Sequence, residues 1–307
     1  MKYHLRHTTR YDYSGSVTLS HNEARILPRT LPWQLCDETH LVVTPQPERM
    51  RERTDFFGNR VVYFSIERLH DDLQVDVNSV IQTLPRPRPT QDFFSDIAWE
   101  DAVRDLRSDV AQSNRDSLDA RLFSLDSPFI HADRSLGDLA IVSFAPGRNL
   151  LDAVLELNQR IYTEFTYDPD STTVATPLRE VLANRRGVCQ DFAHLAIGCL
   201  RSLGLAARYV SGYMETTPPE GQPKLVGADA THAWVAVFIP GWGWQEIDPT
   251  NGCLPDERYV VLGWGRDFAD VTPLKGVMTG GGEHTLTVAV DVIPQRDEPV
   301  ESMLVHL

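Results

Sequence analysis

Polar and apolar residues alternate along much of the first 84 positions, a pattern typical of strands with one buried face. The alternating runs are short, several are rich in β-branched residues, and turn signals such as Ser14-Gly15 and Gly58-Asn59 separate them. The runs cover residues 2–8, 11–17, 40–43, 61–66 and 73–81. They predict an N-terminal antiparallel β domain of sandwich type.

A proline-rich segment at residues 84–89 ends this domain, because proline can neither continue a strand ladder nor enter a helix interior. Beyond it the hydrophobic period is that of helices, with modest helices expected over 96–114 and 118–125 and a stronger one over 150–165. We therefore divide the chain into an N-terminal β domain (1–84), a helical connection (85–149) and a core (150–307).

The core begins with helices and continues with strands. Apolar residues recur at helical spacing from Gln190 to Leu203, and Gly204 marks the end of that helix. The period then changes to two, with strands expected over 206–215, 231–239, from 244 to 248, and over 284–293, the last of which we assign to the core. Helices followed by antiparallel strands predict an α+β core.

Composition and charge argue against some classes of binding partner. The 307 residues include 43 acidic and 29 basic side chains, for a formal net charge of −14, which argues against nucleic acid or an anionic membrane as the main partner. No apolar run is long enough to span a bilayer, and the N-terminus lacks the apolar core of a signal peptide. The four cysteines are scattered and form no CxxC pair, so neither a disulfide scaffold nor a zinc site is expected, and the cytoplasm is the default location.

Cys189 is the candidate nucleophile, because it stands where the helix begins, two residues after a glycine that permits a tight turn. Unpaired backbone N–H groups and the positive end of the helix dipole gather at such a terminus and favour a thiolate, the form that a nucleophile needs. The alternative is structural: a small apolar residue that closes the helix onto the core.

Thiolate chemistry on an acyl group also needs a base and a third group that orients the base, and His232 and Asp248 are the candidates. If the hairpin between them closes with a three-residue loop, Asp248 lies opposite Trp234 and one diagonal from His232; a four-residue loop puts it on the other face. Asp229 is a rival orienting group, but three residues from His232 along one strand it should face away. Taken singly, His232 also fits a core role and Asp248 a turn.

Three motifs carry a resemblance to a known family: RGVCQDFA at 186–193, HAW at 232–234 and GWQEIDPTNG at 243–252. In this order and spacing they resemble the transglutaminase-like superfamily of cysteine enzymes. HTTRYDY at 7–13 resembles the N-terminal domain of its bacterial members, and GRDFADV at 265–271 is similar to a stretch of that subgroup. The resemblance covers about residues 150–273 and implies a papain-like α+β core.

The resemblance also implies roles: Cys189 as nucleophile, His232 as its base and later proton donor, and Asp248 as the group that orients the imidazole. The implied reaction is attack on the carbonyl of a peptide or amide substrate, a thioester, and transfer to water or an amine. Hydrolysis is favoured, because nothing in the sequence identifies an amine acceptor site. The alternatives are a protein-glutamine transglutaminase and a non-catalytic binding or assembly module that retains the fold.

Several residues remain open between a functional and a structural role. The backbone N–H of Cys189 is the first candidate for an oxyanion donor, with Tyr167 as a second donor or a packing residue. Trp234, Trp242 and Trp244 either wall a substrate groove or fill the hairpin core, and Arg266 and Asp267 either touch substrate or form an ion pair. His194 and Cys199 are assigned to packing.

No cofactor is expected. The chain has no calcium loop of the EF-hand type, so the metal dependence of animal transglutaminases is not carried over. A zinc site that combines Cys189, His232 and Cys253 is a minor alternative. The sequence does not indicate an oligomeric state.

Overall fold

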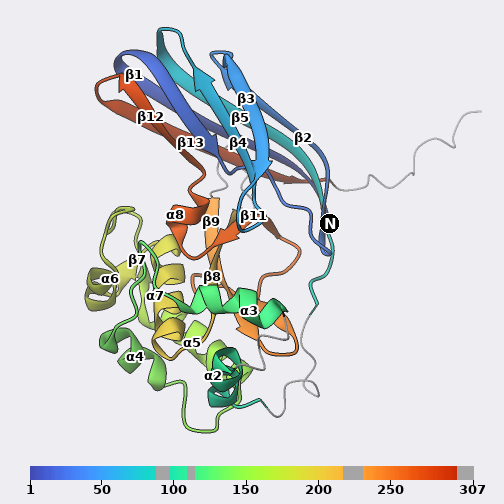
Figure 1. The fold of residues 1–307 in the computed structure, drawn as a ribbon, viewed down its shortest axis with the longest axis vertical. Helices are drawn as coiled ribbons and strands as arrows, with labels where there is room; N and C mark the ends of the chain where they lie inside the picture. Colours follow the sequence, from blue (N-terminus) through green and yellow to red (C-terminus); the bar gives the residue numbers. More distant parts are fainter. Residues whose placement is uncertain (88–96, 109–114, 217–230, 296–307) are drawn as a thin grey trace, which may run out of the picture.

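The computed structural model describes residues 1–87, 97–108, 115–216 and 231–295. Figure 1 shows a part made of long strands beside a part that carries the helices and a smaller sheet. The predicted α+β class, with a β domain built from the N-terminal strands, is confirmed.

The long strand β1 (Lys2–Ala24) organises the larger sheet. Its first half pairs with β5 (His70–Thr83) and its second half with β4 (Arg60–Ile66). The two outer strands, β2 (Gln34–Thr44) and β3 (Arg49–Thr54), extend the sheet from β5 and β4. Apolar side chains of β4 and β5 share one core, so the two halves of the sheet close on each other in the manner of a sandwich.

Two late strands complete this sheet: β12 (Leu274–Gly280) pairs with the second half of β1, and β13 (His284–Pro294) pairs with the first half. The assignment of the last strand to the core is therefore corrected, because β13 belongs to the sheet of the N-terminal domain (Figure 1). Alternation identifies a strand but not its partner, which long-range packing decides.

The helical connection contains α2 (Trp99–Arg107), α3 (Arg115–Arg121), a 3₁₀ turn η2 (Leu122–Ser124) and α4 (Arg134–Ile141). The first two expected helices correspond to α2 and to α3 with η2, although residues 96 and 109–114 of the first lie outside the described residues. The helix α4 was not predicted from the sequence, and Asp133 caps it by accepting the N–H of Leu136 at 3.0 Å.

The core is a four-stranded antiparallel sheet with its two longest helices on one face. The strand order is β10 (Gly243–Ile247), β9 (Thr231–Ile239), β8 (Ala207–Met214) and β11 (Tyr259–Gly265). The central helix α7 (Cys189–Ser202) packs on β8 and β9, and α5 (Leu150–Glu164) packs against α7. The shorter elements are α6 (Leu178–Asn184), α8 (Phe268–Val271) and the paired two-residue strands β6 (Thr166–Tyr167) and β7 (Arg186–Gly187).

The two sheets pack against each other through apolar side chains of β8 and β11 on one side and of β1 and β13 on the other. The amide of Gln34 adds a polar link: its Nε2 donates to the carbonyl of Val261 at 2.8 Å, and its Oε1 accepts the Val261 N–H at 2.7 Å. This side chain satisfies the backbone of β11 at the edge of the core sheet. Within the described part of the chain, no helix is both long and apolar enough to cross a membrane.

Candidate active site

Cys189 is the first residue of α7, and the chain enters the helix through a tightly fixed turn. The Asp191 carboxylate folds back to accept the Val188 N–H at 2.8 Å and the Thr172 hydroxyl at 2.6 Å. Gly187 makes room for this fold, since a Cβ there would come within 2.7 Å of the Asp191 carboxylate. The turn therefore holds the Cys189 thiol at a defined place, where it is partly exposed.

His232 lies near the start of β9, and its imidazole is largely buried. Trp234, two residues on along the same face, stacks on it with a centroid distance of 5.9 Å and an interplanar angle of 27°. Gly212 is the partner of His232 on β8 and has no side chain to displace this indole. A Cβ at Gly212 would lie 2.5 Å from the Trp234 ring and would also meet the Val260 carbonyl oxygen.

We expect Gly212→Ala to lower the free energy of unfolding by about 1–3 kcal/mol, because the added methyl forces the Trp234 indole and the β11 backbone apart. Chemical denaturation measures this change. Gly241→Ala is the contrasting variant, because a Cβ there meets nothing within 4 Å, although its positive φ adds backbone strain of its own. A Gly212→Ala protein as stable as the wild type would contradict the close packing of Gly212 on Trp234.

The hairpin that joins β9 to β10 sets the position of Asp248. Ile239 pairs with Gly243, so the loop has three residues, and the register continues to the pair Val235 and Ile247. The next residue, Asp248, therefore lies on the face that carries His232, as the three-residue loop requires. Its Oδ2 atom accepts a hydrogen bond from His232 Nε2 at 2.7 Å. The rival candidate Asp229 lies outside the described residues.

The carboxylate of Asp248 is fully buried and accepts further hydrogen bonds. The Tyr259 hydroxyl and the Asn251 side-chain amide each donate to Oδ2 at 2.7 Å. The backbone N–H groups of Thr250 and Asn251 donate to Oδ1 at 2.8 and 3.2 Å. Neither side-chain donor was predicted from the sequence: Asn251 stands inside the third motif, whereas nothing in the sequence connects Tyr259 to this carboxylate.

Cys189 and Asp248 engage the imidazole of His232 from two sides. The thiol of Cys189 hydrogen-bonds to His232, and because Nε2 faces Asp248, the nitrogen left for sulfur is Nδ1. Burial by itself would lower the pKa of His232, but the hydrogen bonds to Asp248 and Cys189 and their negative charge raise it to about 10. Burial would likewise raise the pKa of Asp248, yet the hydrogen bond from His232 and those from its neighbours hold it below the usual value. The arrangement favours an imidazolium beside the sulfur.

Tyr167 lies on β6 opposite Gly187, close to the start of α7, and 56% of its surface is exposed. Partial burial, and then the nearby Cys189, raise the pKa of its phenol. The phenol therefore stays protonated near Cys189 and is able to donate a hydrogen bond there.

Two residues that were expected to contact substrate are buried instead. Trp234 is 0% exposed and donates its Nε1–H to Glu246 at 2.9 Å, so it belongs to the hairpin core and walls no groove. Asp267 is also fully buried: it caps α8 by accepting the Ala269 N–H at 2.9 Å and accepts the Phe129 N–H at 2.7 Å. A motif gives the position of a residue in the chain but not its exposure.

Most of the remaining candidate residues have structural roles. Trp242 packs against the core, and Trp244 lines a separate pocket beside Arg208. Arg266 pairs with Asp270 at 2.9 Å rather than with Asp267. His194 is buried and accepts the Phe268 N–H at 3.1 Å, and Cys199 lies in the core, as expected for packing residues.

Metal ligands do not gather in the part of the chain that the structure describes, where no three His, Cys, Asp or Glu side chains form a group able to hold an ion. Cys253 lies with its sulfur 3.4 Å from the Tyr259 hydroxyl. Its thiol therefore contacts the residue that supports Asp248.

Two sequence families match the chain. Residues 3–82 match the bacterial transglutaminase-like N-terminal region, and residues 142–249 match the transglutaminase-like superfamily. An uncharacterised protein of Mycobacterium tuberculosis is 39% identical over 298 residues, which cover 95% of this chain and 93% of that protein. A protein-glutamine gamma-glutamyltransferase of Pseudomonas aeruginosa is 27% identical over 179 residues, which cover 56% of this chain and 25% of that protein.

Among solved structures, a proposed cysteine protease from Cytophaga hutchinsonii has the same fold. The TM-score is 0.73 at 22% sequence identity, and the match covers 97% of this chain and 93% of that one. The likeness therefore extends over both sheets and the helices of the core.

Proposed function

This chain belongs to the transglutaminase-like superfamily, and from that premise we propose that it is a cysteine-dependent enzyme that cleaves an amide or peptide bond through a thioester. The observation that carries the proposal is the imidazole of His232, which is engaged by the Cys189 thiol and, at 2.7 Å, by the buried carboxylate of Asp248. A nucleophile, a base and an orienting group in this order are the requirements for acyl transfer.

In the first half of the proposed reaction, Cys189 Sγ attacks the carbonyl carbon, a C–S bond forms, and the carbonyl oxygen becomes an oxyanion. The backbone N–H of Cys189 has no acceptor in its own helix, so it is free to donate to this oxygen, and Tyr167 is the candidate second donor. His232 gives its Nδ1 proton to the leaving nitrogen, the C–N bond breaks, and an amine departs. Cys189 is then held in a thioester.

In the second half, His232 takes a proton from an incoming water as the water oxygen bonds to the thioester carbon. The C–S bond breaks, the acid leaves, and the proton stays on His232 beside the released thiolate, which restores the starting state. An amine acceptor would follow the same path and give a new amide. The partial match to a gamma-glutamyltransferase makes such transfer the alternative. Incorporation of a labelled primary amine into a glutamine-bearing peptide, at a rate above that of hydrolysis, would favour transfer.

Alkylation of Cys189 tests whether its thiol is activated. Because the pKa of His232 is raised to about 10, its imidazolium persists at every pH below that value and places a positive charge beside the sulfur of Cys189. An adjacent positive charge makes a cysteine more reactive toward alkylation. We expect iodoacetamide to label Cys189 at least about tenfold faster than Cys36 at both pH 6 and pH 8. Mass spectrometry of labelled peptides measures both rates.

In His232→Ala the labelling of Cys189 at pH 6 should slow by about tenfold or more, because the adjacent positive charge is gone. His40→Ala is the matched control, since the side chain of His40 is 75% exposed on the β domain. Equal labelling of Cys36, Cys189 and Cys253 at both pH values would instead support a non-catalytic module that keeps the fold.

A further inference from the structure

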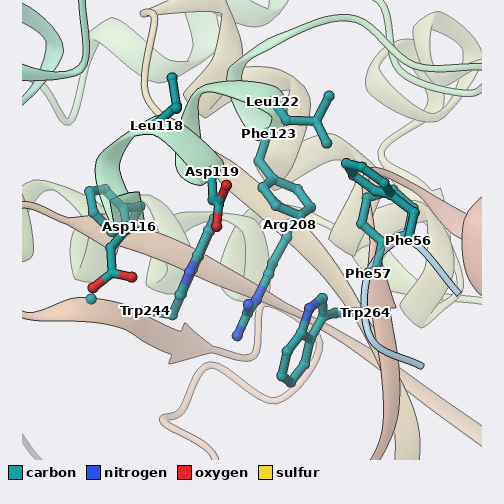
Figure 2. A pocket seen from close by; sticks show the side chains of 12 residues that line it. Phe56, Phe57, Asp116, Leu118, Asp119, Leu122, Phe123, Arg208, Trp244 and Trp264 are labelled. Carbon is teal, nitrogen blue, oxygen red and sulfur yellow. The ribbon is translucent and has the colours of Figure 1, made fainter. Parts of the chain in front are cut away.

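A pocket with a volume of about 690 Å³ opens between the core sheet and the segment formed by α3 and η2 (Figure 2). Its floor includes Arg208, Trp244 and Trp264 from three different strands. Arg208 pairs with Ala236, which is four residues from His232 along β9, or about 13 Å at 3.3 Å per residue. Trp234 stands between the two places on the same face. The pocket is therefore separate from the candidate active site.

The guanidinium of Arg208 is held between two indoles. Its central carbon lies 4.3 Å from the ring centroid of Trp244 and 3.8 Å from that of Trp264. Figure 2 shows the side chain between these two rings. Only 6% of the residue is exposed, yet among the described residues no hydrogen bond or ion pair reaches the guanidinium, and its buried Nε has no partner. A buried cation without an acceptor is a costly arrangement.

Arg201 provides a contrasting example of a buried arginine. It is 3% exposed, and its guanidinium donates to the carbonyls of Phe123, Ala207 and Arg266 and to the Ser127 hydroxyl. The acidic residue whose charge acts most on Arg208 is Glu246, but its carboxylate already accepts from Trp234 and Arg86. Arg208 thus lacks the acceptors that Arg201 has, and its free N–H groups border a cavity.

The geometry selects the kind of acceptor. Because the indoles cover both faces of the guanidinium, an acceptor must approach in its plane, where a carboxylate matches two N–H groups at once. Burial lowers the pKa of Arg208 to about 9, because burying its positive charge costs free energy. An anion bound in the pocket would offset this cost.

The other residues that line the pocket indicate the chemistry of the rest of the ligand. Phe57, Phe123 and Phe238 line the pocket and offer apolar contact. Asp116 and Asp119, on α3, lie at its border and repel anions, a doubly charged phosphate more strongly than a monocarboxylate. The volume is in the range of small-molecule sites.

We propose that this pocket binds a small monocarboxylate with an apolar or aromatic body, whose carboxylate pairs in plane with Arg208. A free aromatic amino acid and the C-terminal residue of a peptide share this chemistry. The proposal does not depend on the activity of Cys189.

Titration of the full chain tests the proposal, with calorimetry for affinity and tryptophan fluorescence for location, since Trp244 and Trp264 line the site. The probes are N-acetylphenylalanine, phenylalanine, N-acetylphenylalaninamide and inorganic phosphate. We expect saturable binding of at least one of the two carboxylates, and binding of the amide and of phosphate at least about tenfold weaker, because a charge-assisted pair is lost or mismatched. Preference for the N-acetylated probe identifies a peptide terminus, and preference for phenylalanine a free amino acid.

Variants locate the bound probe. Arg208→Met should weaken carboxylate binding at least about tenfold, and Leu118→Trp, which narrows the pocket from an exposed position on its border, should also weaken it. Cys189→Ala should bind as the wild type does. Equal affinity for the amide, unchanged affinity in Arg208→Met, or loss of binding in Cys189→Ala would each overturn the proposal. If Arg208→Met does not fold, unchanged binding in Leu118→Trp overturns it alone.

Discussion

Cys189→Ala should lower kcat for an amide or peptide substrate by about 10⁴-fold or more, because it removes the sulfur that attacks the carbonyl carbon. A peptide and amide library screened with the wild-type enzyme supplies the substrate, and release of the amine measures the rate. The variant should fold normally, because the thiol is partly exposed at the first position of α7 and alanine suits a helix.

Cys36→Ala is the matched control, since it removes a partly exposed thiol from β2 in the other sheet and should leave kcat unchanged. A kcat of Cys189→Ala within tenfold of the wild-type value would show that Cys189 is not the nucleophile. The same result would leave the carboxylate pocket at Arg208 untouched, because that binding is measured without turnover.

Asp248→Asn should lower kcat by about 10³- to 10⁴-fold with little change in overall structure. The buried carboxylate accepts at both oxygens, and the two backbone N–H groups at Oδ1 keep the amide oxygen of the new residue on their side. The new amide NH₂ then faces His232 Nε2. It donates to this nitrogen, so the proton moves to Nδ1 and the neutral ring can no longer accept one from the thiol.

Tyr259→Phe provides a milder comparison, because it removes one of the hydrogen bonds to Asp248 Oδ2 and leaves the charge in place. We expect a decrease in kcat of about tenfold. NMR titration of His232 adds a readout of its protonation, and its pKa should fall in Asp248→Asn, since that carboxylate is the main group that raises it. An Asp248→Asn enzyme with a wild-type rate would show that the carboxylate does not orient the base.

Local patterns predicted the parts of the fold that depend on near neighbours. The apolar stripe from Gln190 to Leu203 corresponds to α7, and the alternation over 231–239 corresponds to β9. Loop length decided the side on which Asp248 lies, so the sequence could state the condition but not which loop forms. The contact of His232 with Asp248 then follows from the register.

Distant packing decided what the sequence could not predict. Trp234 and Asp267 stand in or beside recognisable motifs, yet both are buried, because neighbouring elements cover them. Tyr259 reaches Asp248 from another strand, and Arg208 meets Trp264 only because β11 lies beside β8. Such contacts depend on the order of strands in the sheet, which the alternation of polar and apolar residues does not specify.

The joining of β1 to β12 and β13 has a consequence for biosynthesis. Residues 2–24 are synthesised long before β12 and β13, which pair with one edge of β1 and begin only after residue 273. Until then β1 exposes unpaired backbone groups, and closing so wide a loop is slow. The nascent polypeptide is therefore prone to aggregate during this interval. A chain released before residue 274 would lack the two strands that complete its larger sheet.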